Sequence, residues 1–259
     1  MSDTVLLQRD GAIATITLNR PERRNAFNLE MWSALGDVMA DLNGDDGLRC
    51  VVLRGAGDKA FAAGADIAEF SKVRFSAKQA EAYAETMDRA TDAVRDCPHP
   101  TLAMIRGACV GGGLELAIHC DLRISGRSGR IGIPINRIGN ALPYAAMIAL
   151  VEAVGRPTVL ELLLEGRIFD AEEACAKGLI TRVVEDGALE AEVQATAGRI
   201  AAGAPLVARA HKIFSRKAAA PSDLQDKDWA APFEICDSED YREGIRAFLA
   251  KESPNFTAQ

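Results

Sequence analysis

The chain of 259 residues carries a net charge of −7, with 48% hydrophobic and 26% charged residues. This composition is ordinary for one large α/β domain, or for a domain with a smaller appendage, and the scattered basic residues argue against a nucleic-acid partner. No apolar run reaches the ~18–20 residues that span a bilayer. The N-terminus has no visible signal peptide, so we expect a cytoplasmic protein without membrane association.

Cysteine and histidine spacing gives no sign of a metal site. The six cysteines are spread along the chain without a C-x-x-C pair, as is typical of small buried hydrophobic residues in a reducing compartment. His99, His119 and His211 are too far apart to suggest a ligand set, and His119 follows an apolar segment where a core histidine is expected. We therefore expect no metal.

The first third of the chain predicts a hairpin, a helix and a buried strand. Residues 5–8 and 12–18 alternate in polarity around an Asp-Gly turn. Asn28 is a candidate N-cap for a helix that continues to Leu42, and residues 50–54 form a short apolar run.

Residues 59–67 are small, contain one glycine and show no clear period, which predicts a loop after the strand at 50–54. Loops that follow the carboxyl ends of strands are where open α/β sheets place their ligands. A helix over residues 77–95 and a buried strand over residues 101–105 come next.

Residues 111–121 are the most informative stretch. Three glycines open an apolar segment, and one carboxylate, Glu115, lies in its first predicted helical turn. A backbone without Cβ atoms can approach a ligand closely, and the first N–H groups of a helix have no partner within the helix. This pattern predicts a site for an oxyanion with an acid or base beside it, although the stretch alone also fits a tight turn with a capping glutamate.

The C-terminal part is mostly helical. Strands are expected at 121–125, 131–134 and 181–184, and helices at 144–154, 157–165, 171–177, 188–202 and 205–219, with two more beyond them. The predicted architecture is a layered α/β core over residues 1–195 and a helical region over residues 196–259. The helical region is thin and is expected to pack on the core or on a neighbouring subunit.

Two motifs together resemble the enoyl-CoA hydratase/isomerase (crotonase) family. Residues 60–67 read Ala-Phe-Ala-Ala-Gly-Ala-Asp-Ile, and residues 111–117 read Gly-Gly-Gly-Leu-Glu-Leu-Ala. The likeness covers nearly the whole chain, including residues 16–28, 166–180 and 243–251. The resemblance implies a crotonase-like α/β fold, with a ββα-type core and a helical C-terminal region.

The resemblance also implies a chemistry. Members of the family bind acyl-CoA thioesters and stabilise a thioester enolate with two backbone N–H groups, which would here be those of Ala65 and Gly112. Glu115 would be the acid/base. Coenzyme A would enter as part of the substrate, with no metal or redox cofactor. The protein would be a homotrimer or a dimer of trimers acting in fatty acid metabolism.

The implied contacts with substrate and CoA are spread along the chain. They are Arg24, Ala26, Ala63, Asp66, Ile67, Ile135, Phe248 and Lys251. Phe248 and Lys251 would reach the adenine end of CoA from a neighbouring subunit, whereas Arg24 and Lys251 would suit its phosphates, and a solvated surface charge is the alternative for each. Asp66 is expected to brace its own loop through backbone N–H groups.

One position departs from the family pattern. Hydratases of this family carry a second glutamate directly after a proline, and this chain reads Ile133-Pro134-Ile135 there. An isoleucine transfers no proton, and the loss of a positioned acid or base typically costs ~10²–10⁴-fold in rate. The candidates for a replacement are Asn140, Tyr144, Glu69 and Tyr83.

The leading expectation is therefore reversible water addition to a 2-enoyl-CoA with Glu115 as the acid/base. Isomerisation, decarboxylation, dehydration and thioester hydrolysis on the same fold remain open, as does a CoA-ester-binding protein with weak catalysis. The pocket wall is expected to be apolar. Its predicted members are Phe70, Val73, Phe75, Ile133, Ile135 and Leu142.

Overall fold

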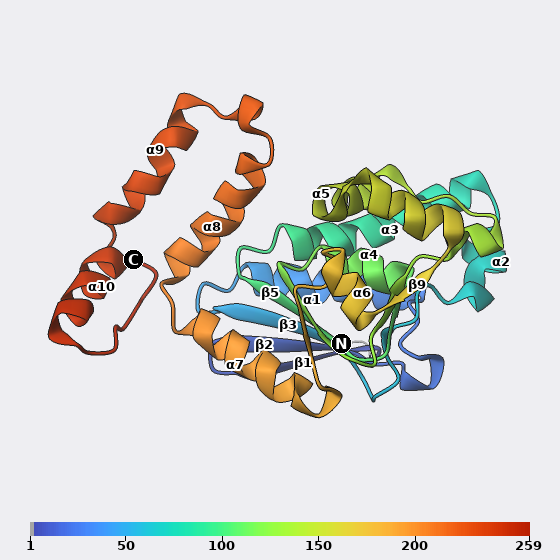
Figure 1. Cartoon of the computed structure of the whole chain (residues 1–259), viewed down its shortest axis with the longest axis horizontal. Coiled ribbons are helices and arrows are strands. Elements are labelled where there is room, and N and C mark those ends of the chain that lie inside the picture. The colour runs from blue at the N-terminus through green and yellow to red at the C-terminus, as the bar shows by residue number, and fades with distance from the viewer. Residues whose placement is uncertain (1–2) are drawn as a thin grey trace.

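The computed structural model describes residues 3–259 and contains two β-sheets flanked by helices (Figure 1). The larger sheet has six strands in the order β1-β2-β3-β5-β7-β10. These are β1 (Val5–Asp10), β2 (Ile13–Leu18), β3 (Cys50–Gly55), β5 (Thr101–Ile105), β7 (Leu122–Gly126) and β10 (Arg182–Val184). β1 and β2 form the predicted antiparallel hairpin, and every other neighbouring pair is parallel.

The second sheet has four strands of three residues each. They are β4 (Ala60–Ala62), β6 (Ala108–Val110), β8 (Arg130–Gly132) and β9 (Ile168–Asp170), in the order β4-β6-β8-β9. The prediction of a loop throughout residues 59–67 was therefore wrong in part, because its first residues form β4. Strands this short and rich in small residues give no period that a sequence pattern could detect.

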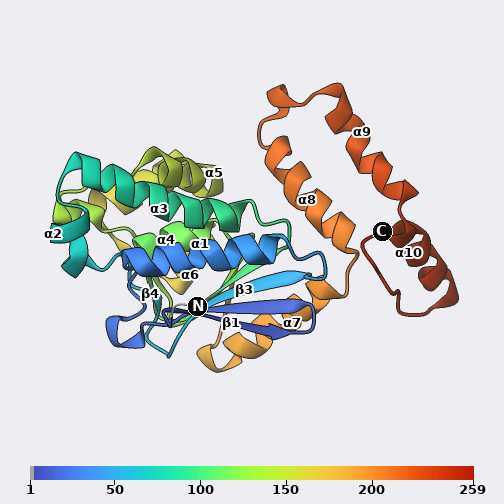
Figure 2. The same cartoon turned by 180° about the vertical axis from the view of Figure 1, so that it is seen from behind.

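Helices cover both faces of the larger sheet (Figures 1 and 2). Side chains alternate along β3, so that Val51 and Leu53 join the core cluster with α1 (Leu29–Asn43) and α3 (Ala77–Arg95). Cys50 and Val52 face the opposite way, into a second cluster with α7 (Leu189–Ala201).

The predicted N-cap of α1 and the predicted break between residues 154 and 157 are both observed. Asn28 Oδ1 accepts a hydrogen bond of 3.0 Å from Met31 N and begins α1, as predicted. The helices expected at 144–154 and 157–165 lie in α5 (Tyr144–Leu160) and the π-helical turn Glu161–Glu165. The chain bends at Gly155, whose φ of 72° is compatible with glycine and not with a continuous helix. The remaining core helices are α2 (Phe70–Val73), α4 (Gly112–Ile118) and α6 (Ala171–Ala176).

The last three helices form an arm that extends away from the core in both views (Figures 1 and 2). They are α8 (Pro205–Ala218), α9 (Asp226–Glu234) and α10 (Glu239–Ala250). The expected boundary at 195/196 falls inside α7, where Val193 and Ala197 are both buried against the sheet. The helices that leave the core therefore begin with α8.

The arm is fastened to the core through α8. Lys212 Nζ lies 2.6 Å from Asp121 Oδ2 and is 9% exposed, and it also donates to the carbonyl of His99. The same Asp121 carboxylate accepts hydrogen bonds from the N–H and hydroxyl of Thr101 at the start of β5. The end of α4, the start of β5 and the arm therefore meet at one carboxylate.

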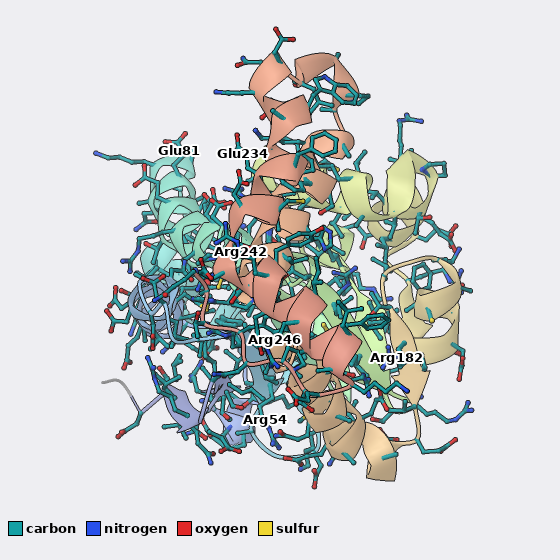
Figure 3. The ribbon with its side chains drawn as sticks, turned by 90° about the vertical axis from the view of Figure 1, so that its left-hand side faces the viewer. Arg54, Glu81, Arg182, Glu234, Arg242 and Arg246 are labelled. Atoms are coloured by element: carbon teal, nitrogen blue, oxygen red, sulfur yellow. The ribbon has the colours of Figure 1, made fainter. Side chains whose placement is uncertain are left out.

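Large apolar side chains of the arm are exposed. Trp229 is 66% exposed, Phe233 74% and Phe248 84%. Figure 3 looks onto this end of the molecule, with Arg242 and Arg246 labelled on α10, where each pairs with a glutamate of the same helix, Glu239 and Glu243. Within residues 3–259 of a single chain these apolar side chains have no surface to pack against, which is typical of an interaction site.

Candidate active site

Two glycine turns meet at the edge of the second sheet. Gly64 and Gly111 both have positive φ, 102° and 53°, and a Cβ placed on Gly111 would lie 3.6 Å from the Gly64 Cα. A Cβ on Gly113 would lie 2.3 Å from the carbonyl oxygen of Ala62, which is too close for any side chain. The absence of side chains at these turns lets α4 begin directly against β4.

This contact places two unpaired backbone donors side by side. The N–H of Phe27 donates to Gly64 O and the N–H of Asp66 donates to Phe27 O, so the intervening Ala65 N–H points away from this bridge. Among residues 3–259 neither the Ala65 nor the Gly112 N–H has a hydrogen-bond acceptor. A Cβ on Gly112 would lie 3.8 Å from the Ala65 nitrogen, so the two residues lie next to each other.

Glu115 lies in the first turn of α4 beside these donors. Its side chain is buried, with only 7% of the residue exposed, and within residues 3–259 its carboxyl group has no hydrogen-bond partner. Burial raises the pKa of Glu115 to about 7. The nearby charge of Arg74 lowers this pKa, and that of Asp88 raises it. A carboxyl group with this pKa can both accept and return a proton near neutral pH.

A cavity of about 260 Å³ opens onto Glu115 and the donors. Most of its wall is apolar or backbone: Ala63, Gly64, Ala65, Ile67, Phe70, Val110, Gly111, Gly112, Ile133, Pro134, Ile135 and Ile138. Its polar side chains are Glu115, Arg74, Arg137 and Asn140. An apolar hollow with a few convergent polar groups is typical of a small-molecule site. A larger hollow of about 580 Å³ between β1 and α1 is lined by neither a buried acid nor a glycine turn.

The predicted pocket wall is half right. Phe70, Ile133 and Ile135 line the cavity, whereas Val73, Phe75 and Leu142 do not, and Phe75 is 81% exposed. Val73 and Leu142 instead pack against the hydrophobic core.

Of the four candidates for a second proton donor, only Asn140 lines the cavity. Tyr144 is 85% exposed and lies outside it. Glu69 accepts a hydrogen bond from the N–H of Leu29, and the hydroxyl of Tyr83 accepts one from Trp32 Nε1, so both side chains serve packing around α1. Burial raises the pKa of Tyr83 to about 12. Within residues 3–259 Glu115 is the only carboxyl group that lines this cavity.

The loop that carries Ala65 is braced by an ion pair. Asp66 Oδ1 accepts from Ala68 N, as predicted, and Asp66 Oδ2 also lies 2.9 Å from Arg20 Nη2, a partner that the sequence did not reveal. The hydrogen bond with Arg20 holds the pKa of Asp66 below its usual value. Arg20 donates to Ala26 O as well, so the segment with Ala26 is fixed against this loop.

The proposed CoA contacts separate into two groups. Ala63 N donates to Arg24 O, which places the exposed Arg24 next to the loop of the cavity, and Ala63 and Ile67 line the cavity itself. Phe248 and Lys251 lie on and directly after α10, at the opposite end of the molecule from α2 (Figure 1). Within one chain these two residues do not reach the cavity, so any contact must come from another copy.

Sequence analysis missed Arg74. It follows α2 and lines the cavity, with its guanidinium 5.0 Å from the centre of the Phe70 ring and 5.2 Å from that of Tyr83. One arginine after a short helix carries no pattern that would distinguish it from a surface charge.

Other functional groups do not gather in the described structure. Within residues 3–259 no cluster of three His, Cys, Asp or Glu side chains could hold a metal ion, and no helix is long and apolar enough to cross a membrane. His119 lies outside the cavity that contains Glu115, and burial lowers its pKa to about 4, as fits a core histidine.

Comparison with known proteins agrees with this geometry. A sequence profile of the enoyl-CoA hydratase/isomerase family matches residues 8–259. A crystal structure of an enoyl-CoA hydratase/carnithine racemase from Magnetospirillum magneticum superposes with a TM-score of 0.97 at 50% identity, covering 100% of this chain and 97% of that one. The crotonyl-CoA hydratase of Syntrophomonas wolfei is 31% identical over 99% of both chains. A Thermus thermophilus protein provisionally assigned as an enoyl-CoA hydratase is 37% identical over 95% of this chain and 98% of its own.

The fold is thus that of the crotonases, with a helical C-terminal region. The chain belongs to the enoyl-CoA hydratase/isomerase family and is an enzyme of that family, which acts on acyl-CoA substrates.

Proposed function

We propose that this enzyme adds water reversibly to a 2-enoyl-CoA, with Glu115 as its acid/base and with Ala65 and Gly112 as its oxyanion donors. One observation supports this above all: a single buried, unpartnered carboxyl group lines the same cavity as two unpaired backbone N–H groups. Donors aimed at developing negative charge commonly contribute more to such catalysis than any other group, and removing one costs ~10²–10³-fold in kcat.

The proposed steps balance with one proton shuttle. The Glu115 carboxylate takes a proton from water while the water oxygen bonds to Cβ, and the double-bond electrons move to form the enolate. The N–H groups of Ala65 and Gly112 hold the enolate oxygen. The Glu115 carboxyl then gives its proton to Cα, and the thioester carbonyl forms again. A pKa of about 7 suits both halves of this cycle.

Ile135 supports a second candidate reaction. Because no second carboxyl group from the described residues lines the cavity, a reaction that needs only one proton shuttle is favoured. Moving a double bond between the 3- and 2-positions meets this condition, because Glu115 can take the proton from one carbon and return it to the other. Enoyl-CoA isomerisation is therefore the alternative.

Two assays on the purified protein separate these reactions. Loss of the conjugated-thioester absorbance with crotonyl-CoA would report hydration, and its appearance with a 3-enoyl-CoA would report isomerisation. We expect hydration at a measurable rate, slower than a two-glutamate enzyme by ~10²–10⁴-fold. Turnover of the 3-enoyl ester alone would replace hydration by isomerisation. Tight binding without turnover of either ester would overturn both and leave decarboxylation, or CoA-ester binding with weak catalysis.

We further infer that the working form is a homo-oligomer, a trimer or a dimer of trimers, in the cytoplasm. The exposed aromatic side chains of the arm, and the distance of Phe248 and Lys251 from the cavity of their own chain, support this. Arg24, beside the loop with Ala63, remains the proposed contact for a CoA phosphate. The proposed reaction needs no cofactor besides the CoA that the substrate carries. Light scattering on the intact protein would give the mass, and a monomer would contradict the inference.

A further inference from the structure

Two cations line the proposed acyl cavity, and they are held differently. Arg137 donates to the carbonyl of Gly166 at 2.9 Å, which ties it to the wall. Arg74 is half-buried, and among residues 3–259 its guanidinium has no ion pair and no hydrogen bond. The guanidinium instead makes cation–π contacts with the rings of Phe70 and Tyr83. Aromatic faces orient a guanidinium but leave its N–H donors free.

The cavity offers Arg74 no permanent counter-ion. Within residues 3–259 Glu115 is the only carboxyl group that lines the cavity, and the proposed function requires it to change its charge in each cycle. Substrate entry also removes water from Arg74, and an unpaired charge that loses its water is costly. A ligand that brings an anion into the cavity would remove this cost.

The anion would belong to the acyl group rather than to CoA. The loop with Ala63 has its own exposed cation beside it, because the carbonyl of Arg24 accepts a hydrogen bond from Ala63 N and Arg24 does not line the cavity. Arg74 instead stands over Phe70, which lines the cavity together with Glu115. A guanidinium binds a carboxylate through two parallel hydrogen bonds, which gives both strength and orientation.

We propose that Arg74 is the specificity-determining residue of this cavity and selects acyl-CoA thioesters whose acyl chain carries a carboxylate. The inference rests on the proposed function for the location of the acyl group. The cavity of about 260 Å³ is below the ~300–1,000 Å³ of common ligand sites, so the carboxylated chain is a short one. The cation also offsets the repulsion that a substrate carboxylate would otherwise meet from ionised Glu115.

The test compares 4-carboxybut-2-enoyl-CoA with pent-2-enoyl-CoA, which differ in the terminal group of a five-carbon chain. We expect the native enzyme to favour the carboxylated ester in kcat/KM by at least ~10-fold. Arg74→Met should lower that preference by ~10–100-fold, the factor expected for charged hydrogen bonds of ~1.5–3 kcal/mol. Arg74→Lys should keep part of it. Arg137 also lines the cavity, and Arg137→Met should change the preference by less than ~3-fold.

Binding measurements keep this test independent of turnover. Calorimetry with the saturated 4-carboxybutanoyl-CoA and pentanoyl-CoA should show the same preference and the same loss in Arg74→Met. If neither unsaturated ester reacts but the binding preference depends on Arg74, the proposed hydration fails and this inference stands. Equal weakening of both esters would assign Arg74 to CoA or to the fold and overturn the inference, as would an unchanged preference.

Discussion

The two walls of the cavity differ in what holds them. One wall, residues 63–67 and 111–115, consists of glycine turns in backbone contact, and it carries the N–H donors and Glu115. The other wall, residues 133–140, contains a short 3-10 turn (Ile135–Ile138) whose side chains are half-buried or exposed. In the proposed mechanism, stabilisation of the enolate therefore depends on backbone geometry, whereas a second proton-transfer group would depend on one side chain. The comparison teaches that the proposed intermediate would be a property of the fold, and that side chains of the second wall would determine which product forms from it.

The largest expected effect comes from removing the acid of the first wall. Glu115→Gln keeps the shape of the side chain and should lower kcat by ~10²–10⁴-fold, because no other carboxyl group in the described part of the chain lines the cavity. In the native enzyme, hydration should rise as the pH passes about 7, since the carboxylate form takes the proton from water. Glu69→Gln is the matched control, as its carboxyl group only accepts a bond from Leu29 N. Similar losses in both variants would contradict the role of Glu115.

The backbone of the first wall can be tested almost as strongly. Gly112 is the first residue of α4, a position where proline is tolerated, so Gly112→Pro removes the N–H while the helix can still begin there. We expect a ~10²–10³-fold loss of kcat. Gly112→Ala keeps the N–H and makes the same Cβ contact, 3.2 Å from Trp32 Cζ2. If the alanine variant lost as much activity as the proline variant, steric crowding rather than the lost donor would explain the result.

The buried acid should also lower stability in a pH-dependent way. The pKa of Glu115 is about 7 in the folded protein, against an ordinary value of 4.5, so the unfolded state releases its proton first as the pH rises. The folded state therefore loses stability between these values and carries the full penalty above pH ~7. Glu115→Gln should raise the free energy of unfolding by about 3 kcal/mol at pH 8, and the gain should vanish near pH 4.5. Denaturant titrations at both pH values provide the measurement, and a gain that is independent of pH would speak against a buried, titrating Glu115.

The smallest effect is expected from adding an acid to the second wall. Ile135→Glu places a carboxyl group on the cavity wall opposite the glycine turns, and hydration should rise by ~10–100-fold as a second shuttle becomes available. Ile135→Gln, which has the same shape without the proton, should give no gain. A faster isomerisation without faster hydration would instead identify the native reaction as the one-shuttle type.

Much of the fold could be predicted because it depends on local patterns. The helix over residues 77–95 and the strand over residues 101–105 were predicted with their observed bounds. β4 and β6 could not be found, because strands of three residues are too short to show the alternation that identifies a strand. The contact of Ala65 with Gly112 came from a family resemblance, since no periodicity relates two turns so far apart in sequence.

The site was predicted less completely because part of it depends on contacts between residues that are distant in sequence. Glu115 was visible as a lone carboxylate in an apolar run, but the proposed role of Arg74 depends on its contacts with the rings of Phe70 and Tyr83. Its lack of an ion-pair partner within residues 3–259 is a property of three-dimensional neighbours and cannot be derived from spacing along the chain. The same holds for Arg20, whose partner Asp66 lies 46 positions away.

The carboxylate of Asp121 has a consequence for how such a chain can diverge. It binds Lys212 of the arm and Thr101 of the sheet, directly beyond the end of the helix that carries Glu115. All residues of the cavity wall precede position 141, and the arm begins at Pro205. Two further residues of α8 also pair with the core, Arg209 with Asp46 and Arg216 with Asp96. Substitutions elsewhere in the arm can therefore change how copies associate while Glu115 keeps its place, provided that these attachments of α8 are kept. The association of copies and the position of the buried acid can in this sense change separately during evolution.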